Sequence, residues 1–300
     1  MLLESNIMNE KLPSYGGQAV IEGVMMRGAK GVAIAMRSPN RDIVVHTEAL
    51  SGIYRSRITR MPFLRGLVGL WDALGLGVRA LTISANLQTG EEEQIEGPAL
   101  FITMAISLAF GVGLFFLAPA AVGQLGERWL HWNAWWSNVL EGVVRLLLLV
   151  GYVWVIGFMP DVRRVFAYHG AEHKTINAFE SGADLTPENV AKFSLEHPRC
   201  GTAFLLTLVV FSVFLFSLLG PLPLAWRLAS RVLLIPVLAG VAYEYIRWTA
   251  LHLDSALVRF IIKPNLALQH LTTREPNLEM LEVSIAAFNA MRNEERTLSL

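Results

Sequence analysis

Four long apolar windows with almost no charge constrain the fold of this chain more than any other feature. In sequence order they are residues 98–125, 139–159, 202–219 and 228–246. A helix needs about 20 apolar residues to cross about 30 Å of hydrocarbon, so each window can form one membrane span. Of the 300 residues, 17% are charged and the mean hydropathy is +0.45, whereas soluble domains carry about 25% charged residues. We therefore predict a multi-pass α-helical membrane protein with four transmembrane helices in a lipid bilayer.

The segments between the windows alternate between many and few basic residues. Ten lysines and arginines precede the first window, one follows it, five lie between the second and third, one precedes the fourth and six follow it. Cytoplasmic loops of membrane proteins carry the excess of lysine and arginine. The distribution therefore predicts a chain with both termini in the cytoplasm. Tryptophans typical of a membrane–water interface cluster between the first two windows: Trp129, Trp132, Trp135 and Trp136.

The net charge is zero and the chain has one cysteine, Cys200. Zero net charge gives no indication of a nucleic-acid partner, and a single cysteine excludes an internal disulfide. Inside the second window, Glu141 and Arg145 are four residues apart. They can pair on one helix face, which lowers the cost of placing them in a membrane.

The segment before the first window is predicted to form a small cytoplasmic α+β portion. Residues 15–28 combine paired glycines with short apolar runs, which indicates a strand with tight bends; Glu22 is the residue there that could have a function. Residues 32–37 and 43–48 alternate around a turn-forming cluster, which predicts a β-hairpin. Over 61–88, apolar residues recur at helical spacing among arginines, so this helix either lies in the membrane interface or packs on the β-rich unit.

The predicted organisation places cytoplasmic segments around two pairs of transmembrane helices. The order is a flexible tail (1–14), a cytoplasmic β-rich unit with an amphipathic helix (15–97), transmembrane helices one and two (98–160), a cytoplasmic histidine-containing segment (161–201), transmembrane helices three and four (202–247) and cytoplasmic amphipathic helices (248–300). In the last segment, a helix from Asn277 to about Arg292 carries an apolar stripe. Such stripes more often pack in a core than form a partner groove, so we expect this helix to pack on the β-rich unit.

The cytoplasmic segment between the second and third windows contains the sequence His-Gly-Ala-Glu-His at 169–173. On a helix capped by Asp161, His169 and His173 would lie one turn apart on one face, with Glu172 beside them. Two imidazoles at this spacing can bind one divalent metal ion. His-x-x-Glu-His is the inverted zinc-hydrolase signature, in which the glutamate handles the proton of the attacking water. With seven histidines in the chain, this pattern would arise by chance in about one chain in a hundred.

A metal site needs further ligands, since zinc takes three protein ligands and a water in catalytic sites, and four protein ligands in closed structural sites. The candidates are His197, Cys200, Glu180 and Glu244. If both His197 and Cys200 joined, the site would be closed; if one of them joined, a position would remain for water. Glu244 stands near the end of the fourth window, where a lone carboxylate is costly, although it can also pair with Arg247. Cys200 can also be a small buried hydrophobic residue, or a nucleophile with a histidine as its base.

Four stretches of the sequence together resemble one protein family. They are YGGQAVIEGVMMRG at 15–28, HGAEHKT at 169–175, HPRCGT at 197–202 and LTTREP at 271–276. In this order they are similar to the bacterial membrane proteins of domain-of-unknown-function family 1385, and the similarity runs from about Pro13 to Glu282. The resemblance implies an integral protein of the bacterial cytoplasmic (inner) membrane, and a metal-dependent enzyme whose reaction is not established.

The leading functional hypothesis is an integral membrane enzyme with a divalent metal, zinc, held by the two histidines of the motif. Glu172 would be the general base in the hydrolysis of a peptide or ester bond at the cytoplasmic membrane surface. A second hypothesis is a non-enzymatic membrane scaffold, whose polar helix face and basic loops bind a protein partner such as a ribosome or an assembly factor. A third is a small-solute transporter, against which the absence of a visible internal repeat argues. Its membrane-embedded polar groups would be Glu141, Arg145 and Glu244.

Overall fold

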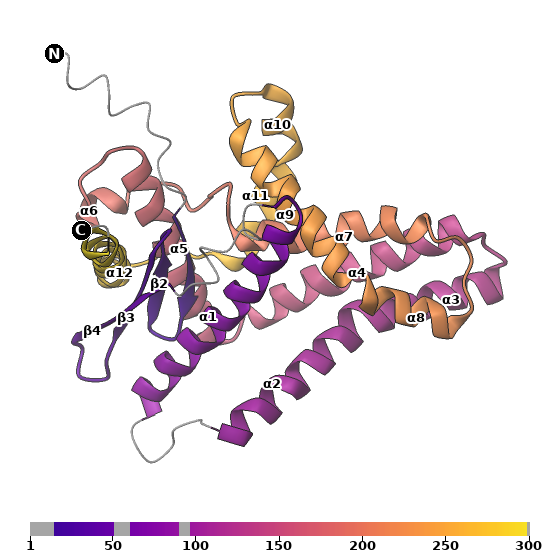
Figure 1. Cartoon of the computed structure of the whole chain (residues 1–300), viewed down its shortest axis with the longest axis horizontal. Coiled ribbons are helices and arrows are strands. Elements are labelled where there is room, and N and C mark those ends of the chain that lie inside the picture. The colour runs from indigo at the N-terminus through magenta and orange to yellow at the C-terminus, as the bar shows by residue number, and fades with distance from the viewer. Residues whose placement is uncertain (1–14, 51–60, 90–96, 299–300) are drawn as a thin grey trace.

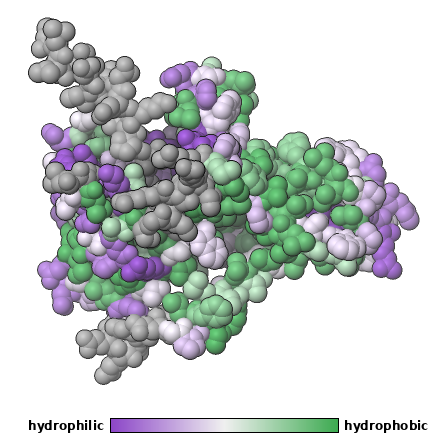
Figure 2. Space-filling view, in the orientation of Figure 1, coloured by the Kyte–Doolittle hydropathy of each residue, from purple (hydrophilic) through white to green (hydrophobic). Residues whose placement is uncertain are grey.

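The computed structural model describes residues 15–50, 61–89 and 97–298. The described chain is mostly helical and has two halves, a four-stranded sheet covered by helices and a bundle of apolar helices that extends away from it (Figure 1). On the face drawn in Figure 2, apolar residues cover most of the bundle, polar residues gather at its far tip, and the sheet half shows a mixture of polar and apolar residues. The flexible tail expected at 1–14 lies outside the described residues.

The sheet is an antiparallel meander with the strand order β1-β2-β3-β4. Its strands are β1 (Gly16–Val20), β2 (Gly23–Arg27), β3 (Gly31–Arg37) and β4 (Ile43–Ala49). The predicted hairpin is confirmed, with Arg37 opposite Ile43. The stretch 15–28 is not one strand, however, because the chain turns at Ile21 and Glu22 and pairs Val20 with Gly23. β1 and β2 therefore form a hairpin of their own.

Glu22 joins this first turn to helix α5 (Pro160–Glu180). Its backbone adopts a positive φ of 52°, which is uncommon for a residue with a side chain. Its carboxylate accepts hydrogen bonds of 2.5 Å from both Nε and Nη2 of Arg164 and one of 3.3 Å from the Tyr168 hydroxyl. The hydrogen bond from Arg164 holds the pKa of Glu22 below its ordinary value. The structure thus gives Glu22 a role in docking the turn onto α5.

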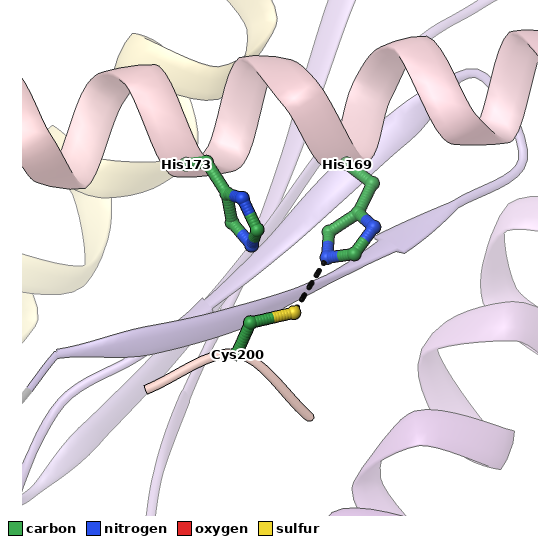
Figure 3. Close-up of side chains that lie close together, drawn as sticks. All are labelled: His169, His173 and Cys200. Carbon is green, nitrogen blue, oxygen red and sulfur yellow. Dashed lines mark hydrogen bonds between the residues drawn. The ribbon is translucent and has the colours of Figure 1, made fainter. Parts of the chain in front are cut away.

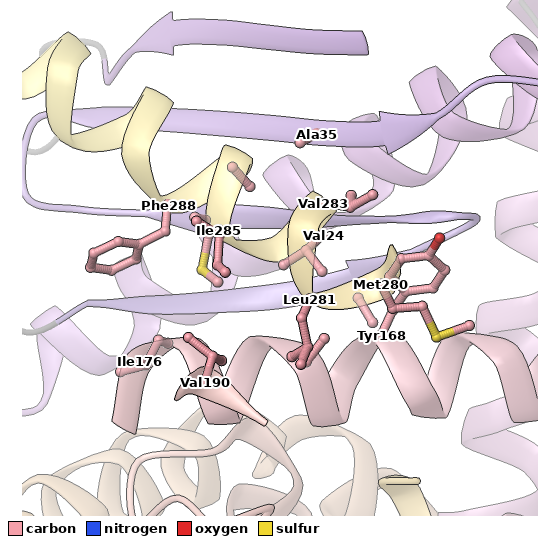
Figure 4. Close-up of a cluster of buried hydrophobic side chains, with 14 of the residues drawn as sticks. Val24, Ala35, Tyr168, Ile176, Val190, Met280, Leu281, Val283, Ile285 and Phe288 are labelled. Carbon is pink, nitrogen blue, oxygen red and sulfur yellow. The ribbon is translucent and has the colours of Figure 1, made fainter. Parts of the chain in front are cut away.

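Helices cover both faces of the sheet, because alternate residues of each strand point to opposite sides. On one face, α5 and α12 (Leu278–Thr297) enclose a core in which Leu281 and Phe288 are fully buried (Figure 4). On the other face, α1 (Leu64–Thr89) packs against buried strand residues such as Met25. The predicted packing of the C-terminal helix on the β-rich unit is confirmed. The helix expected at 61–88 was predicted either to lie in the membrane interface or to pack on the β-rich unit, and the structure shows it packed on the sheet.

The second half is built from apolar helices. They are α2 (Gly97–Val112), the π-helical turn η5 (Gly113–Leu117), α3 (Ala118–Leu130), α4 (Ala134–Ile156), α7 (Gly201–Ser217), α8 (Leu224–Leu233) and α9 (Ile235–Leu251). The described helices that are long and apolar enough to cross a membrane are Leu64–Thr89, Gly97–Leu130 and Ala134–Ile156. The pair α8 and α9, bent by 44°, would make a fourth span if it crosses as one unit, and α7 is a shorter apolar helix. The windows predicted at 98–125 and 139–159 therefore correspond to long apolar helices, and the later two to α7 and the bent pair.

A buried ion-pair network joins the helices of the bundle. Arg145 on α4 and Arg231 on α8 donate to the Glu141 carboxylate at distances from 2.7 to 2.9 Å, and Arg227 reaches it at 3.4 Å. Each of these four side chains is at most 3% exposed. Arg145 also donates to the Phe115 carbonyl of η5 at 2.7 Å. Because a charge in an apolar interior is costly unless it is paired, the network fixes α4 against α8, and Glu141 and Arg145 are engaged in structural pairs.

We expect Glu141→Ala to destabilise the protein strongly, since it leaves buried arginines without their shared carboxylate. The free energy of unfolding should fall by about 3–5 kcal/mol, measured by unfolding of the detergent-solubilised protein followed by circular dichroism. The control is Glu48→Ala, which removes a carboxylate paired with Arg79, a side chain that is 60% exposed. That change should cost less than about 1 kcal/mol. Equal losses in the two variants would contradict a structural role for the network.

Candidate metal centre

Helix α5 carries the histidine motif, with one side of the helix packed on the sheet and the two histidines on another side (Figure 3). It begins two residues earlier than expected: Met159 is the N-cap, Pro160 occupies the first helical position, and Asp161 lies in the first turn instead of capping it. Proline fits this position because its missing N–H would have no partner there. Tyr168 and Ala171 face the sheet and belong to the core. The two histidines project from α5 on another side.

His169 and His173 point from α5 toward Cys200, the N-cap residue of α7 (Figure 3). One possible ligand atom from each of the three residues lies within 4.8 Å of the others. His169 Nε2 is 3.3 Å from Cys200 Sγ, and the centroids of the two imidazole rings are 4.4 Å apart. Zinc bond lengths and a tetrahedral angle place ligand atoms about 3.5 Å apart. The three residues therefore have nearly the spacing that a single ion requires.

Backbone carbonyls determine which nitrogen of each imidazole carries the proton. His169 Nδ1 lies 2.9 Å from the Thr272 carbonyl oxygen, and His173 Nδ1 is bonded to the Leu195 carbonyl oxygen. Because a carbonyl can only accept, each Nδ1 must donate, and each neutral ring keeps a lone pair on Nε2. His173 Nε2 is buried and has no hydrogen-bond partner among the described residues. Metal-binding histidines have this arrangement, with one nitrogen bonded to a carbonyl and the other free for the ion.

The segment that leads into Cys200 is held against α5 by bonds to its backbone. Asn177 Nδ2 donates to two carbonyls of this segment, at 2.9 and 3.0 Å, and Lys174 Nζ donates to a third at 2.7 Å. Gln269 of α11 (Lys263–Thr272) accepts from the His197 N–H at 2.9 Å and donates to the His197 carbonyl at 2.8 Å. These bonds determine where Cys200 sits relative to the histidines.

Glu172 is buried beside the three residues. Its Oε2 lies 3.9 Å from His169 Nε2. Burial raises the pKa of Glu172 to about 7, although the electrostatic interaction with His169 and a hydrogen bond from the Gly17 backbone act in the opposite direction. A Cβ at Gly17 would lie 2.9 Å from Glu172 Cγ, so the glycine of β1 allows this close approach. A carboxyl group with a pKa near neutral can both accept and return a proton.

Two other predicted ligands, His197 and Glu180, lie near the three residues but outside their group. The His197 ring centroid is 5.7 Å from that of His173, and its Nε2 is 3.8 Å from Glu180 Oε2. Burial lowers the pKa of His197 below its ordinary value. Glu180 forms an ion pair with Arg199. These two residues therefore support the segment around Cys200, and the geometry does not bring them to the histidine pair.

Glu244 lies elsewhere, where α9 meets α1. Its carboxylate accepts from Arg65 Nε at 2.7 Å and from the Phe63 N–H at 3.0 Å. The sequence allowed a pair with Arg247, one turn away on the same helix, whereas the structure pairs Glu244 with Arg65 of α1. Its position joins α1 to the bundle and leaves it apart from the histidines.

Three contributors to the site were not found from the sequence, namely Gln269, the Thr272 carbonyl and Gly17. Thr272 and Gly17 do lie in the stretches 271–276 and 15–28 that carry the family resemblance, which was the available signal. Gln269 gave none, because a glutamine on an amphipathic helix usually faces solvent. In the structure it is fully buried.

We expect Gln269→Ala to loosen the segment around Cys200. It removes the bond to the buried His197 N–H and leaves the His197 carbonyl with only the Cys200 N–H at 3.3 Å. The free energy of unfolding should fall by about 1–3 kcal/mol. Amide hydrogen exchange should also become faster over residues 191–200. The control, Gln88→Ala, removes one bond to the Arg37 carbonyl in the sheet half and should leave exchange in that segment unchanged. Unaltered exchange in Gln269→Ala would contradict this account of the segment.

Comparison with known proteins identifies a family without a known reaction. Residues 61–294 match the family model described as "Protein of unknown function (DUF1385)". The chain is 33% identical over 299 residues to the "Uncharacterized protein YqhQ" of Bacillus subtilis (strain 168). This alignment covers 93% of the present chain and 92% of the Bacillus protein. No solved structure matches. The predicted family is thus confirmed, while the metal-dependent activity implied by the resemblance is not part of either description. The chain belongs to the DUF1385 family of proteins of unknown function.

Proposed function

We propose that His169, His173 and Cys200 bind one divalent metal ion, zinc, in an integral membrane enzyme. Two observations carry the proposal: His173 Nε2 is buried and has no hydrogen-bond partner among the described residues, and one possible ligand atom each of His169, His173 and Cys200 lies within 4.8 Å of the others. Two imidazoles and one thiolate form a donor set that suits zinc. Three protein ligands leave one position open, as in catalytic zinc sites.

Hydrolysis is the reaction class that these groups fit best. When bound, zinc would supply an activated water at neutral pH and polarise a substrate carbonyl. The Glu172 carboxylate, with Oε2 3.9 Å from His169 Nε2, can accept the proton of that water and return it to the leaving group. The Gly17 N–H orients this carboxylate. The substrate bond that would be cleaved is a peptide or ester bond.

We place this site at the cytoplasmic face of the bacterial inner membrane. Support comes from the basic residues, which concentrate before the first apolar window, between the second and third, and after the fourth. With four crossings, the positive-inside rule puts these segments in the cytoplasm. Cys200 caps the apolar helix α7, and α5 follows α4 closely along the chain, so the site lies next to the ends of two apolar helices. The scaffold alternative, with a protein partner at the same face, would have a closed site or no metal.

Protein purified in detergent should contain about one equivalent of zinc per chain, measured by plasma mass spectrometry. His173→Ala should reduce the zinc content to a small fraction, because it removes the buried ligand. His252→Ala is the matched control, since His252 is an exposed histidine bonded to the Trp248 carbonyl, and it should keep the metal. Correctly folded wild-type protein without any bound metal would remove the proposal and favour the scaffold.

Glu172→Gln should keep the metal and lower hydrolysis of fluorogenic peptide or ester substrates by about 10²–10⁴-fold, the usual contribution of a general base. Glu180→Gln on the same helix is the control, because its partner is Arg199, and its turnover should stay within about tenfold of wild type. Retained turnover in Glu172→Gln would rule out the assigned role.

A further inference from the structure

The helical segment that follows α9 exposes an apolar stripe. Helix α10 (Ala256–Ile261) continues into α11 past Ile262, whose N–H bonds to the Val258 carbonyl at 3.0 Å and whose carbonyl accepts from Leu266 at 3.0 Å. Helical spacing therefore applies across this junction. Leu257, Phe260 and Ile261, at positions i, i+3 and i+4, are 65%, 68% and 39% exposed. Val258 and Ile262 face inward and are buried.

A basic face adjoins this apolar stripe. Arg259 and Lys263 are four residues apart, so they share one side of the helix. Both are exposed, and Lys263 Nζ lies 5.8 Å from the centre of the Phe260 ring. Across 247–263 the chain carries three cations and one carboxylate, Asp254. The segment thus has three faces, which are buried, exposed apolar and basic.

Helix α10 lies at the end of the apolar bundle that is next to the sheet half (Figure 1). It projects beside the end of α9, at the junction between the sheet half and the bundle (Figure 1). The last turn of α9 exposes Trp248 (46%) and Leu251 (58%), and tryptophans of membrane proteins gather at the headgroup level. An exposed apolar stripe next to lysine and arginine is what a helix in the plane of a membrane surface presents.

We propose that Leu257, Phe260, Ile261, Arg259 and Lys263 form a face that binds the anionic headgroup surface of the bilayer. Charge complementarity selects this occupant: the apolar stripe enters the headgroup boundary, while the two cations contact lipid phosphates. The inference rests on the proposed membrane crossing by α9 and goes beyond the metal site, because it concerns the lipid that the protein contacts.

The same helix links this surface to the metal centre. α11 begins at Lys263 and carries Gln269, which holds the His197 backbone, and Thr272, whose carbonyl bonds to His169 Nδ1. Headgroup contact at α10 therefore fixes the height of the three metal-binding residues above the bilayer. Substrates for such a site are presented at the membrane surface.

The test compares the full-length protein in nanodiscs of phosphatidylcholine with nanodiscs of an equal mixture of phosphatidylcholine and phosphatidylglycerol. Amide hydrogen exchange over 252–263 should slow by about tenfold in the anionic discs, given the attraction of each cation to anionic lipid. The double variant Arg259→Gln/Lys263→Gln should lose this slowing, and Phe260→Ser should lose part of it. The matched control is Arg292→Gln/Arg296→Gln, an equally spaced pair on α12, which should behave as wild type.

Two outcomes would overturn the proposal. One is exchange over 252–263 that is the same in both kinds of disc. The other is slowing that appears in neutral discs only after a soluble protein fraction is added, which would make this face a protein-binding surface. Zinc content, measured on the same samples, separates these outcomes from a failure of the metal site, because the α10 variants leave every proposed ligand in place.

Discussion

The candidate metal centre depends on the hydrogen bonds between α5 and the segment that leads into Cys200. Buried polar groups must find partners, and this irregular segment has no sheet or helix to supply them. The side chains of Lys174, His173 and Asn177 therefore bond to its carbonyls. Gln269 completes the set from α11. Removing any of these would free the segment and with it the position of the cysteine sulfur.

The structure contains two buried polar systems that differ in one physical respect. Around Glu141, three arginines, a backbone carbonyl and hydroxyl groups share their bonds, and the carboxylate uses both oxygens. The charges are paired inside an apolar bundle, which gives the network a structural purpose. Arg227 Nε has no hydrogen-bond partner among the described residues, but an arginine nitrogen only donates and offers no lone pair to a metal. At the histidines, by contrast, the atom without a partner among the described residues is His173 Nε2, which carries a lone pair because Nδ1 is bonded to the Leu195 carbonyl. That difference is why we assign ligand binding to the second system and structure to the first.

Two helices, α1 and α5, join the sheet half to the bundle. α1 covers one face of the sheet and also binds α9, through Arg65 and Glu244. α5 covers the other face and closely follows α4 along the chain. Both connections are made by helices that pack on the same sheet, so the sheet is joined to the apolar helices on both of its faces.

Much of this could be predicted from the sequence, because it depends on local patterns. Apolar length indicated the long helices at 97–130 and 134–156, alternation indicated the hairpin of β3 and β4, and helical spacing placed His169, Glu172 and His173 together. The family followed from four stretches of sequence. The first hairpin was missed because its turn, Ile21-Glu22, lacks the usual turn residues, and long-range bonds from Arg164 and Tyr168 hold Glu22 in place.

Which of the four candidate ligands lies next to the histidine pair depends on the tertiary structure, which brings Cys200 there. Cys200 is 31 residues from His169, and the sequence offered Glu244 equally as a candidate ligand. Which of them meets the histidines depends on how α7 and the preceding segment dock on α5 and α11, and those contacts join residues up to 72 apart. Sequence spacing determines which residues are neighbours on one helix, whereas the residue that lies opposite the two histidines is determined by how several helices pack.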